Sequence, residues 1–309
     1  MKSIFGFFLK TFADDYNYVE RLIESFNKHN KDNLVMYLMC STSELALFKK
    51  FKSENIKIIN EEKLGHYLVN DFSINNTRPG YVNQCILKLS FWELDLLENY
   101  YCIDSEAVFI DDFYLKDFIA ENESPYSFLI EDNELKVDPV YYLEHGIGRD
   151  RSLKNIKKYL ELNKHVLLTN HGHCTFSSLV LRSFKNQVLI TNKISYKDLM
   201  KISFYEFSWY NFYLQKTRLI EIIVREPIIK VFHSYKMYND YLSKNITIED
   251  IKRGYKAYLI NSNFSRESGV ISYGEKVYVP TFKEILFLTK SLFNLIYNKF
   301  KNMFSKIFD

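Results

Sequence analysis

Glycine, proline and cysteine are scarce in this sequence, and each scarcity excludes a class of protein. The 309 residues include nine Gly and five Pro, too few for a collagen-like repeat or a long disordered linker. The four cysteines lie far apart and form no C-x-x-C pair. This spacing argues against a zinc ribbon or a disulfide framework, and it is typical of small buried residues in a reducing compartment.

Long apolar runs are also missing. No segment reaches the ~18 consecutive apolar residues of a membrane span. The apolar run near the N-terminus is interrupted by Lys10 and is followed by Asp14 and Asp15, with no small-residue cleavage site. It therefore predicts a first β-strand rather than a signal peptide. We expect a protein that is soluble or peripheral to a membrane.

The composition is that of a folded globular protein, with 47% hydrophobic and 26% charged residues. We find no internal repeat and no low-complexity linker, so we expect one domain over residues 1–275 and a tail over residues 276–309. The formal net charge is +3, and the six Lys of the tail against Glu284 and Asp309 give the tail +4, so the remainder sums to −1. We expect no nucleic-acid partner.

Apolar periodicity predicts alternating strands and helices at the start of the chain. Apolar segments at 3–12, 33–41 and 56–60 are typical of buried strands, and helical spacing occupies residues 13–30 and 43–55. This βαβαβ order predicts an α/β fold with a mainly parallel sheet flanked by helices. Helical spacing also runs through 196–217, and a late strand that begins at Ile228 ends in His233.

An acidic triplet, Asp104-Ser105-Glu106, ends another predicted strand. In open parallel sheets, ligands gather beyond the carboxyl ends of the strands. Mg²⁺ and Mn²⁺ prefer carboxylate and phosphate oxygens, and side chains two positions apart on a strand can point the same way. The triplet indicates a metal site that carries a phosphorylated substrate. The alternative is a polar end of a buried strand.

Three motifs in this order resemble one enzyme family. They are KTFADD near the N-terminus, R-P-G-x-x-x-Q-x-x-x-K-L-x-F-W from Arg78, and Y-C-I-D-S-E-A-V-F-I around the triplet. The arrangement resembles bacterial nucleotide-sugar-dependent glycosyltransferases of the GT-A fold, and most of all a poorly characterised group from surface-polysaccharide (capsule or lipooligosaccharide) gene clusters. The resemblance covers roughly residues 3–265. It implies a GT-A-like, Rossmann-type sheet and a D-x-D-type motif that holds a divalent metal on the donor diphosphate.

The resemblance also implies roles for single residues. Asp104 and Glu106 would hold Mn²⁺ or Mg²⁺, and His233, after the last core strand, would be a further ligand. Glu206, near the start of a helix, would be the catalytic base of an inverting transfer. Its aromatic neighbours favour the protonated form of a carboxyl group and suit a base near neutral pH. The alternatives are a solvated helix residue for Glu206 and a histidine bonded to backbone for His233.

Other residues are candidates for substrate contacts. Each has a structural alternative: a surface salt bridge for the residues around the second motif, and a helix N-cap for Asp14. Trp209 belongs to an aromatic group that would form a wall against a sugar, and Gly172 would let a loop approach the sugar or acceptor closely. The predicted donor-binding residues are Thr11, Asp14, Arg78, Gln84, Lys88 and Asp104, and the predicted acceptor or loop residues are His171, Gly172 and Trp209.

The tail predicts a basic amphipathic helix. Over residues 281–309 apolar residues form one helical stripe, from Ile285 to Ile307, and Lys, Asn and Ser occupy the opposite one. Such a helix suits an anionic membrane interface. The alternative is packing on the protein's own core or on a second subunit.

These observations predict a cytoplasmic enzyme, peripheral on the inner face of the membrane. It would move a sugar from a nucleoside diphosphate donor, with a UDP-sugar favoured, to a cell-surface glycan or glycolipid. A sugar nucleotidyltransferase is disfavoured because KTFADDYN lacks the Gly-rich loop with Arg that such enzymes carry after the first strand. A non-catalytic glycan-binding or nucleotide-binding protein of the same fold is the other alternative.

Overall fold

The computed structural model describes residues 2–70, 77–130, 142, 146–169, 173–233 and 235–261. Five strands form a central sheet in the order β3-β2-β1-β4-β9. They are β1 (Ser3–Lys10), β2 (Met36–Cys40), β3 (Ile56–Asn60), β4 (Leu97–Ile103) and β9 (His173–Ser177). Every neighbouring pair is parallel except β4 with β9. The predicted α/β fold with a mainly parallel sheet flanked by helices is therefore confirmed.

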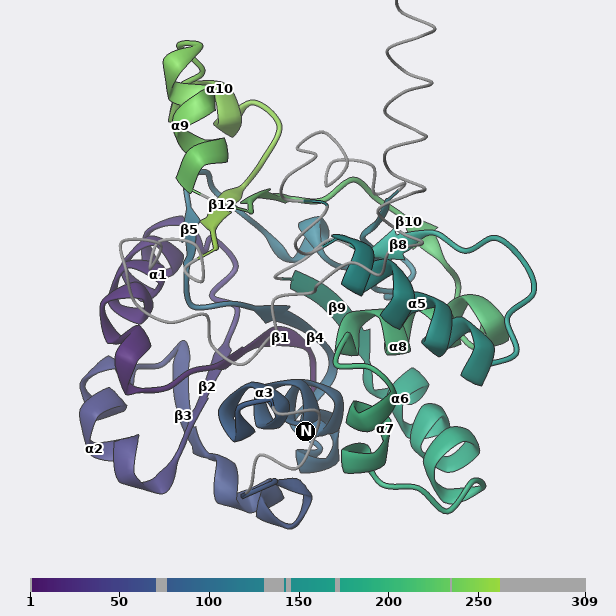
Figure 1. The fold of residues 1–309 in the computed structure, drawn as a ribbon. Helices are drawn as coiled ribbons and strands as arrows, with labels where there is room; N and C mark the ends of the chain where they lie inside the picture. The colour runs from purple at the N-terminus through teal and green to yellow at the C-terminus, as the bar shows by residue number, and fades with distance from the viewer. Residues whose placement is uncertain are drawn as a thin grey trace, which may run out of the picture.

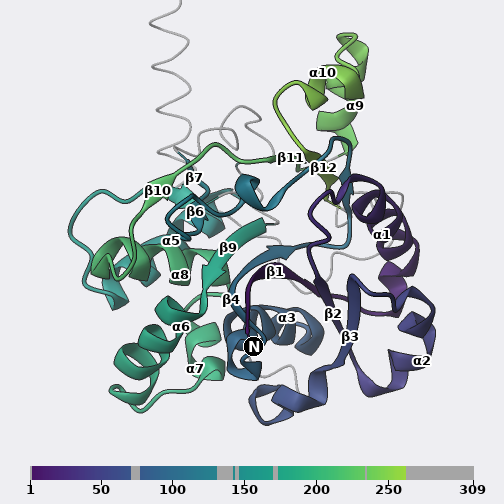
Figure 2. The same cartoon turned by 180° about the vertical axis from the view of Figure 1, so that it is seen from behind.

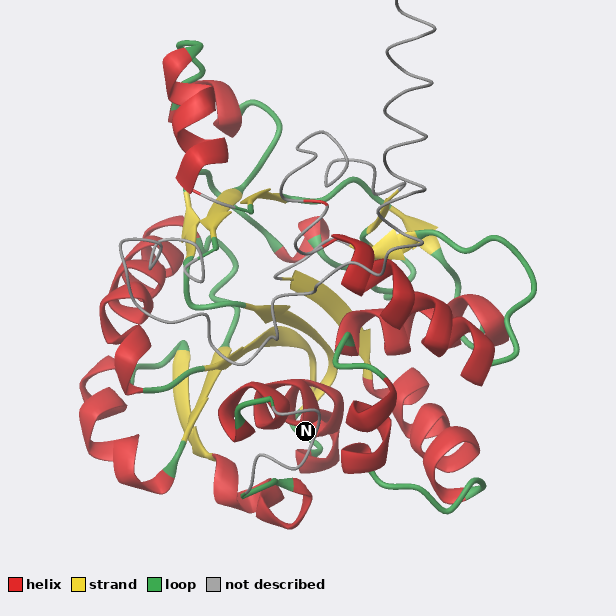
Figure 3. Cartoon of the chain, viewed as in Figure 1, coloured by secondary structure: helices red, strands yellow, loops and turns green. Residues whose placement is uncertain are grey.

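The helices that connect the strands in the sequence pack around the central sheet (Figures 1 and 3). Helix α1 (Tyr16–His29) buries residues spaced along one face, with Val19, Leu22 and Phe26 inaccessible to solvent. Helix α2 (Leu45–Phe48) is short and continues into a 3₁₀ turn. Helix α3 (Pro79–Ser90) begins with a proline in its first turn, where the missing N–H has no intrahelical partner to lose.

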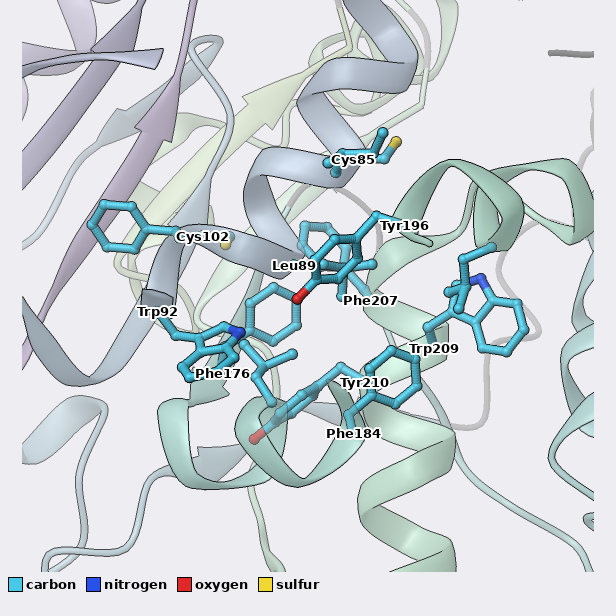
Figure 4. Close-up of a cluster of buried hydrophobic side chains, with 14 of the residues drawn as sticks. Cys85, Leu89, Trp92, Cys102, Phe176, Phe184, Tyr196, Phe207, Trp209 and Tyr210 are labelled. Carbon is cyan, nitrogen blue, oxygen red and sulfur yellow. The ribbon is translucent and has the colours of Figure 1, made fainter. Parts of the chain in front are cut away.

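The sheet separates two apolar cores. Strand residues alternate between its faces, so that Tyr100 and Cys102 of β4 enter one core while Tyr101 and Ile103 enter the other. Figure 4 shows the first core, which contains Tyr100 and Cys102 and to which α3 contributes Leu89 and the later helix α8 (Glu206–Thr217) contributes Phe207. This core fixes α3 against α8, and both helices reach the carboxyl edge of the sheet.

A smaller sheet continues from the end of β4. Strand β5 (Ala107–Phe109) pairs antiparallel with β12 (Ala257–Ile260), which pairs parallel with β11 (Ile229–Phe232). In Figure 2, β11 and β12 lie near the C-terminal end of α1 and above the central sheet, and Phe109 of β5 donates its backbone N–H to Ser25 of that helix. The predicted late strand that ends in His233 is β11, which ends one residue earlier, at Phe232.

The remaining elements complete the second half of the described chain. The helices are α5 (Ile147–Tyr159), α6 (Ser178–Phe184), α7 (Tyr196–Ile202), α8 (Glu206–Thr217), α9 (Tyr235–Ser243) and α10 (Ile248–Lys252), with a π-helix at Lys185–Ile190. The short strands are β6 (Tyr126–Ser127), β7 (Leu129–Ile130), β8 (Leu168–Thr169) and β10 (Ile223–Val224).

Residues 196–217 have helical spacing throughout, but they form two helices, α7 and α8, rather than one. Ser203 is extended, at φ −165°, and ends α7, while its side-chain oxygen accepts a hydrogen bond from the backbone N–H of Tyr205. The indole of Trp209 donates to the Ser203 carbonyl. These bonds fix a break between the two helices, and the break makes Glu206 the first residue of α8.

The predicted tail, residues 276–309, lies outside the described residues. Within the described ranges, none of the helices combines the length and the apolar character needed to cross a bilayer.

Candidate functional site at the carboxyl ends of β1 and β4

The carboxyl ends of β1 and β4 lie side by side. Phe8 pairs with Cys102 in parallel register, so two residues further on Lys10 is level with Asp104. Beyond this point the chain turns, and the hydroxyl of Ser105 donates a hydrogen bond to Asp15 Oδ2 at 2.8 Å. The structure thus brings together the acidic segment after β1 and the acidic triplet after β4.

A buried lysine joins two carboxylates at this edge. Lys88 Nζ of α3 lies 2.8 Å from Asp104 Oδ1 and 3.0 Å from Glu206 Oε1. The side chain of Lys88 is 4% exposed, whereas that of Asp104 keeps 23% exposure. Gln84 Nε2, one helical turn before Lys88, lies 3.4 Å from the same Asp104 oxygen. We call Asp104, Lys88 and Glu206 the bridged trio.

The charge of the trio explains how a lysine is tolerated in the core. Burial by itself lowers the pKa of Lys88, but the charges of Asp104 and then Glu206 outweigh burial and raise that pKa well above its ordinary value. Lys88 is therefore an ammonium ion at neutral pH. Two carboxylates against one ammonium leave the trio with a formal charge of −1. Removing one partner of such a buried ion pair lowers the free energy of unfolding by about 3–5 kcal/mol.

The sequence predicts a purely aromatic environment for Glu206, and the structure differs from this in one respect. Phe207 is present, and its ring lies 4.6 Å from Lys88 Nζ, but the ammonium itself contacts the Glu206 carboxylate. Glu206 is buried rather than a solvated helix residue. The sequence pointed to an apolar pocket, and the structure adds an ion pair to it.

The oxygen donors of the triplet fit a hard divalent cation in part. Asp104 is partly exposed, and Glu106 lies two positions further on. Mg²⁺ is usually held by one or two carboxylates together with substrate phosphates, and Asp104 and Glu106 are of the right chemical type. Residues 105–106 form a turn, however, so the expected strand alternation does not point the two side chains the same way. Across the described ranges, no group of three or more His, Cys, Asp or Glu side chains could hold a metal ion.

His233 accordingly forms no three-ligand group with the triplet. The register pairs Phe232 with Ile260 and Leu259 with Ala107, which places the end of β11 about two strand spacings, ~10 Å, from the start of β5. His233 is buried there. The prediction that it completes a metal site with Asp104 and Glu106 is not supported by this arrangement.

The predicted donor-binding residues after β1 lie at the same edge. Thr11 follows β1, and its hydroxyl is buried without a hydrogen-bond partner among the described residues. Asp14 is exposed in a 3₁₀ turn, Ala13–Asp15, and the N-cap of α1 is Asp15 instead. The alternative role of Asp14 as a helix cap is therefore not observed. Arg78 is the N-cap residue of α3, with no side-chain capping bond.

The prediction for Trp209 is wrong. Its side chain is 0% exposed and lies in the apolar core, where its indole binds the Ser203 carbonyl. Helical periodicity could not separate a sugar-stacking wall from a core face, because both place aromatic residues on one side. His171 and Gly172 lie outside the described residues.

The bridging position of Lys88 was not predicted, although a signal for it exists. Lys88 lies in CILKLSFW, and every residue from Cys85 to Ser90 is buried. A lysine within a wholly apolar stretch of helix indicates a buried ion pair. The sequence alone does not identify the partner, since Glu206 is more than a hundred residues away.

A separate cleft of about 550 Å³ lies at the other end of α8. It is lined by polar residues that include Lys164, Gln215, Arg218 and Glu221, and by apolar residues of the nearby strands. It contains no residue of the predicted site.

The fold and the site together define an α/β protein with a lysine-bridged acidic cluster at the carboxyl edge of a mainly parallel sheet. The chain belongs to a family of unknown function, DUF6492, whose model matches residues 4–241. No curated protein matches the chain. Among solved structures, apo mouse xyloside xylosyltransferase 1 is similar at 9% identity and a TM-score of 0.45, covering 84% of this chain and 98% of that chain. At this TM-score we draw no conclusion from the likeness.

Proposed function

We propose that the protein is a glycosyltransferase that moves a sugar from a nucleoside diphosphate donor to a cell-surface glycan. The observation that carries the proposal is the bridged trio at the carboxyl end of β4. A buried ionic cluster is retained at a considerable cost in stability, and such clusters concentrate at functional sites. This one occupies the edge of the sheet where parallel α/β folds bind their ligands, and it coincides with the motifs that resemble GT-A enzymes.

The two carboxylates of the trio serve different substrates in this proposal. Asp104, with Glu106, faces the donor and would hold Mn²⁺ or Mg²⁺. Such a cation offsets the charge that develops on a departing diphosphate. Glu206 accepts the proton of the acceptor hydroxyl in an inverting transfer. The two roles are compatible because the carboxylates come from different elements, Asp104 after the end of β4 and Glu206 at the start of α8.

The residues after β1 and before α3 complete the donor site. Asp14, which is exposed, receives the nucleoside, with a uridine nucleotide favoured, and Arg78 and Gln84 reach the diphosphate or the sugar. Thr11, the other nucleoside contact predicted from the sequence, has a side chain that is inaccessible to solvent, and we leave it out of the proposed site. His171 and Gly172 are assigned to the sugar or acceptor on the sequence pattern alone, because they lie outside the described residues.

The acceptor and the location follow from the sequence resemblance and the tail. We propose a capsule or lipooligosaccharide acceptor at the cytoplasmic face of a bacterial membrane. Residues 281–309 provide the membrane contact, on the strength of their basic amphipathic pattern.

Release of nucleoside diphosphate tests the proposed activity. Wild-type protein incubated with a panel of nucleoside diphosphate sugars and Mn²⁺ should release nucleoside diphosphate from at least one of them. Asp104→Asn and Glu206→Gln should each lower the rate by about 100-fold or more, as is typical when a charge-stabilising group or a general base is lost.

Asp111→Asn is the matched control for that assay. Asp111 is also a partly exposed carboxylate paired with a lysine, Lys256 at 2.6 Å, but it lies outside the trio. Its variant should keep wild-type activity. Undiminished release by both trio variants, or no release from any donor by the wild type, would contradict the proposal, and donor binding without release would indicate a non-catalytic binding protein.

A further inference from the structure

The Lys88 side chain is almost wholly buried, at 4% exposure. An ammonium has three N–H donors. Two sides of Lys88 Nζ face Asp104 and Glu206, and the Phe207 ring lies 4.6 Å away. With 4% of its side chain exposed, Lys88 offers a diphosphate or a sugar no accessible donor. This geometry is unlike that of a lysine that binds a phosphate directly.

The backbone of Lys88 is held in place by a hydrogen bond, in addition to the ion pairs of its ammonium group. Tyr100 of β4 donates its hydroxyl hydrogen bond to the Lys88 carbonyl at 2.8 Å. The residues on either side of Lys88 in α3 are buried in the core. Helix α3 therefore holds the ammonium at a set position over the end of the sheet.

The two carboxylates that Lys88 contacts belong to different elements. Asp104 follows β4, and Glu206 begins α8 just after the break at Ser203. Their distances from one Nζ atom, 2.8 and 3.0 Å, place Asp104 Oδ1 and Glu206 Oε1 no more than 5.8 Å apart. Two carboxylates this close repel each other unless a cation lies between them.

We propose that Lys88 is a positioning residue that holds the donor-side carboxylate Asp104 and the acceptor-side carboxylate Glu206 at a fixed separation and contacts neither substrate. This inference rests on the proposed function for its catalytic consequence, but its structural part does not depend on any substrate. It replaces the direct donor contact that the sequence suggests for Lys88.

A stability cycle tests the structural part. Lys88→Met, which keeps most of the length of the side chain and removes its charge, should lower the Tm by roughly 5–10 °C, because it leaves the buried Glu206 and the partly exposed Asp104 without their counter-ion. The double variant Lys88→Met/Glu206→Gln should recover part of that loss, since one of the two charges is then gone. An equal or larger loss in the double variant would overturn the proposed bridge.

Lys185→Met is the matched control for the cycle. Lys185 is also a partly buried lysine, and it pairs with Glu93 and Tyr67 away from the trio. Its variant should lower the Tm without any recovery on adding Glu206→Gln, and it should leave activity unchanged at a temperature where the variant is folded.

Kinetics separate a positioning role from a substrate contact. For Lys88→Met we expect kcat to fall about 100-fold while the KM for the donor and the Kd for nucleoside diphosphate change by less than about threefold, because only the geometry of the reacting groups is lost. Lys88→Arg keeps the charge and should restore at least about tenfold of the lost kcat.

Each outcome has one consequence. A tenfold or larger rise in the Kd for nucleoside diphosphate in Lys88→Met, with kcat little changed, would show direct donor contact and overturn the inference. If Lys88→Met does not fold, the Lys88→Arg variant and the double variant still provide the comparison. If the wild type has no transferase activity, the proposed function fails, whereas the stability cycle still decides whether Lys88 bridges the two carboxylates.

Discussion

Tyr101 and His173 form a buried polar pair on neighbouring strands of the central sheet. The Tyr101 hydroxyl and His173 Nδ1 are 2.6 Å apart, and both side chains are inaccessible to solvent. Burial lowers the pKa of His173 to about 3, and a backbone interaction with Ile229 opposes this only in part. His173 is therefore neutral in the folded protein at any pH near neutrality.

This histidine should make the fold sensitive to acid. Its pKa in the unfolded chain is near the ordinary value of 6.5, so the unfolded state gains a proton that the folded state does not between pH 6.5 and pH 3. Above pH 6.5 this histidine does not lower the free energy of unfolding. As the pH falls below 6.5, the free energy of unfolding decreases by at most about 1.4 kcal/mol per pH unit. Chemical denaturation at pH 7, 6, 5 and 4 measures this slope.

His173→Gln should have a smaller loss of stability between pH 6.5 and pH 4 than the wild type. His66→Gln is the control, because His66 is exposed and its replacement should leave the slope unchanged. A wild-type slope in His173→Gln would contradict the assignment of a buried neutral histidine.

At the residue scale, several residues of the site could be predicted from the sequence, but the contacts between them could not. The triplet and Glu206 could be singled out because carboxylates within apolar segments are rare. Their joint contact with Lys88 depends on how α3, β4 and α8 pack, and side-chain spacing within each segment carries no information about that packing. Trp209 was assigned wrongly for the same reason.

At the scale of the elements, local order was predictable and pairing was not. The βαβαβ start is right because its apolar periods are strong and connections between parallel strands follow few rules. Strand β9 pairs antiparallel with β4. The sequence could not predict this pairing, because the residues of an apolar strand do not indicate whether it runs parallel or antiparallel to its neighbour. The break between α7 and α8 depends on two hydrogen bonds of Ser203, which periodicity does not register.

The tail is the element for which the sequence makes the sharpest prediction about partners. If residues 281–309 bind an anionic membrane surface, deleting them should abolish co-sedimentation with vesicles that contain anionic lipid and should spare nucleoside diphosphate release. High salt should weaken binding of the full chain, because the lysine contribution is screened. Unchanged vesicle binding by the truncated protein would contradict the membrane contact.

At the scale of the whole molecule, the sheet organises both stability and chemistry. Its two faces are closed by apolar cores, and its carboxyl edge collects the polar ends of β1 and β4. The first core fixes α3 and α8, and these helices carry the lysine and one carboxylate of the trio. We therefore expect substitutions in that core to affect the geometry of the site as well as the stability of the fold.

Calorimetric titration of the protein with UDP, with and without Mn²⁺, tests the central claim most directly, because it requires neither the acceptor nor the donor sugar. The account predicts binding that Mn²⁺ strengthens and that Asp104→Asn weakens by about tenfold or more, while the control Asp111→Asn binds like the wild type. Absence of binding to UDP and to the other nucleoside diphosphates, or binding that Asp104→Asn leaves unchanged, would contradict it.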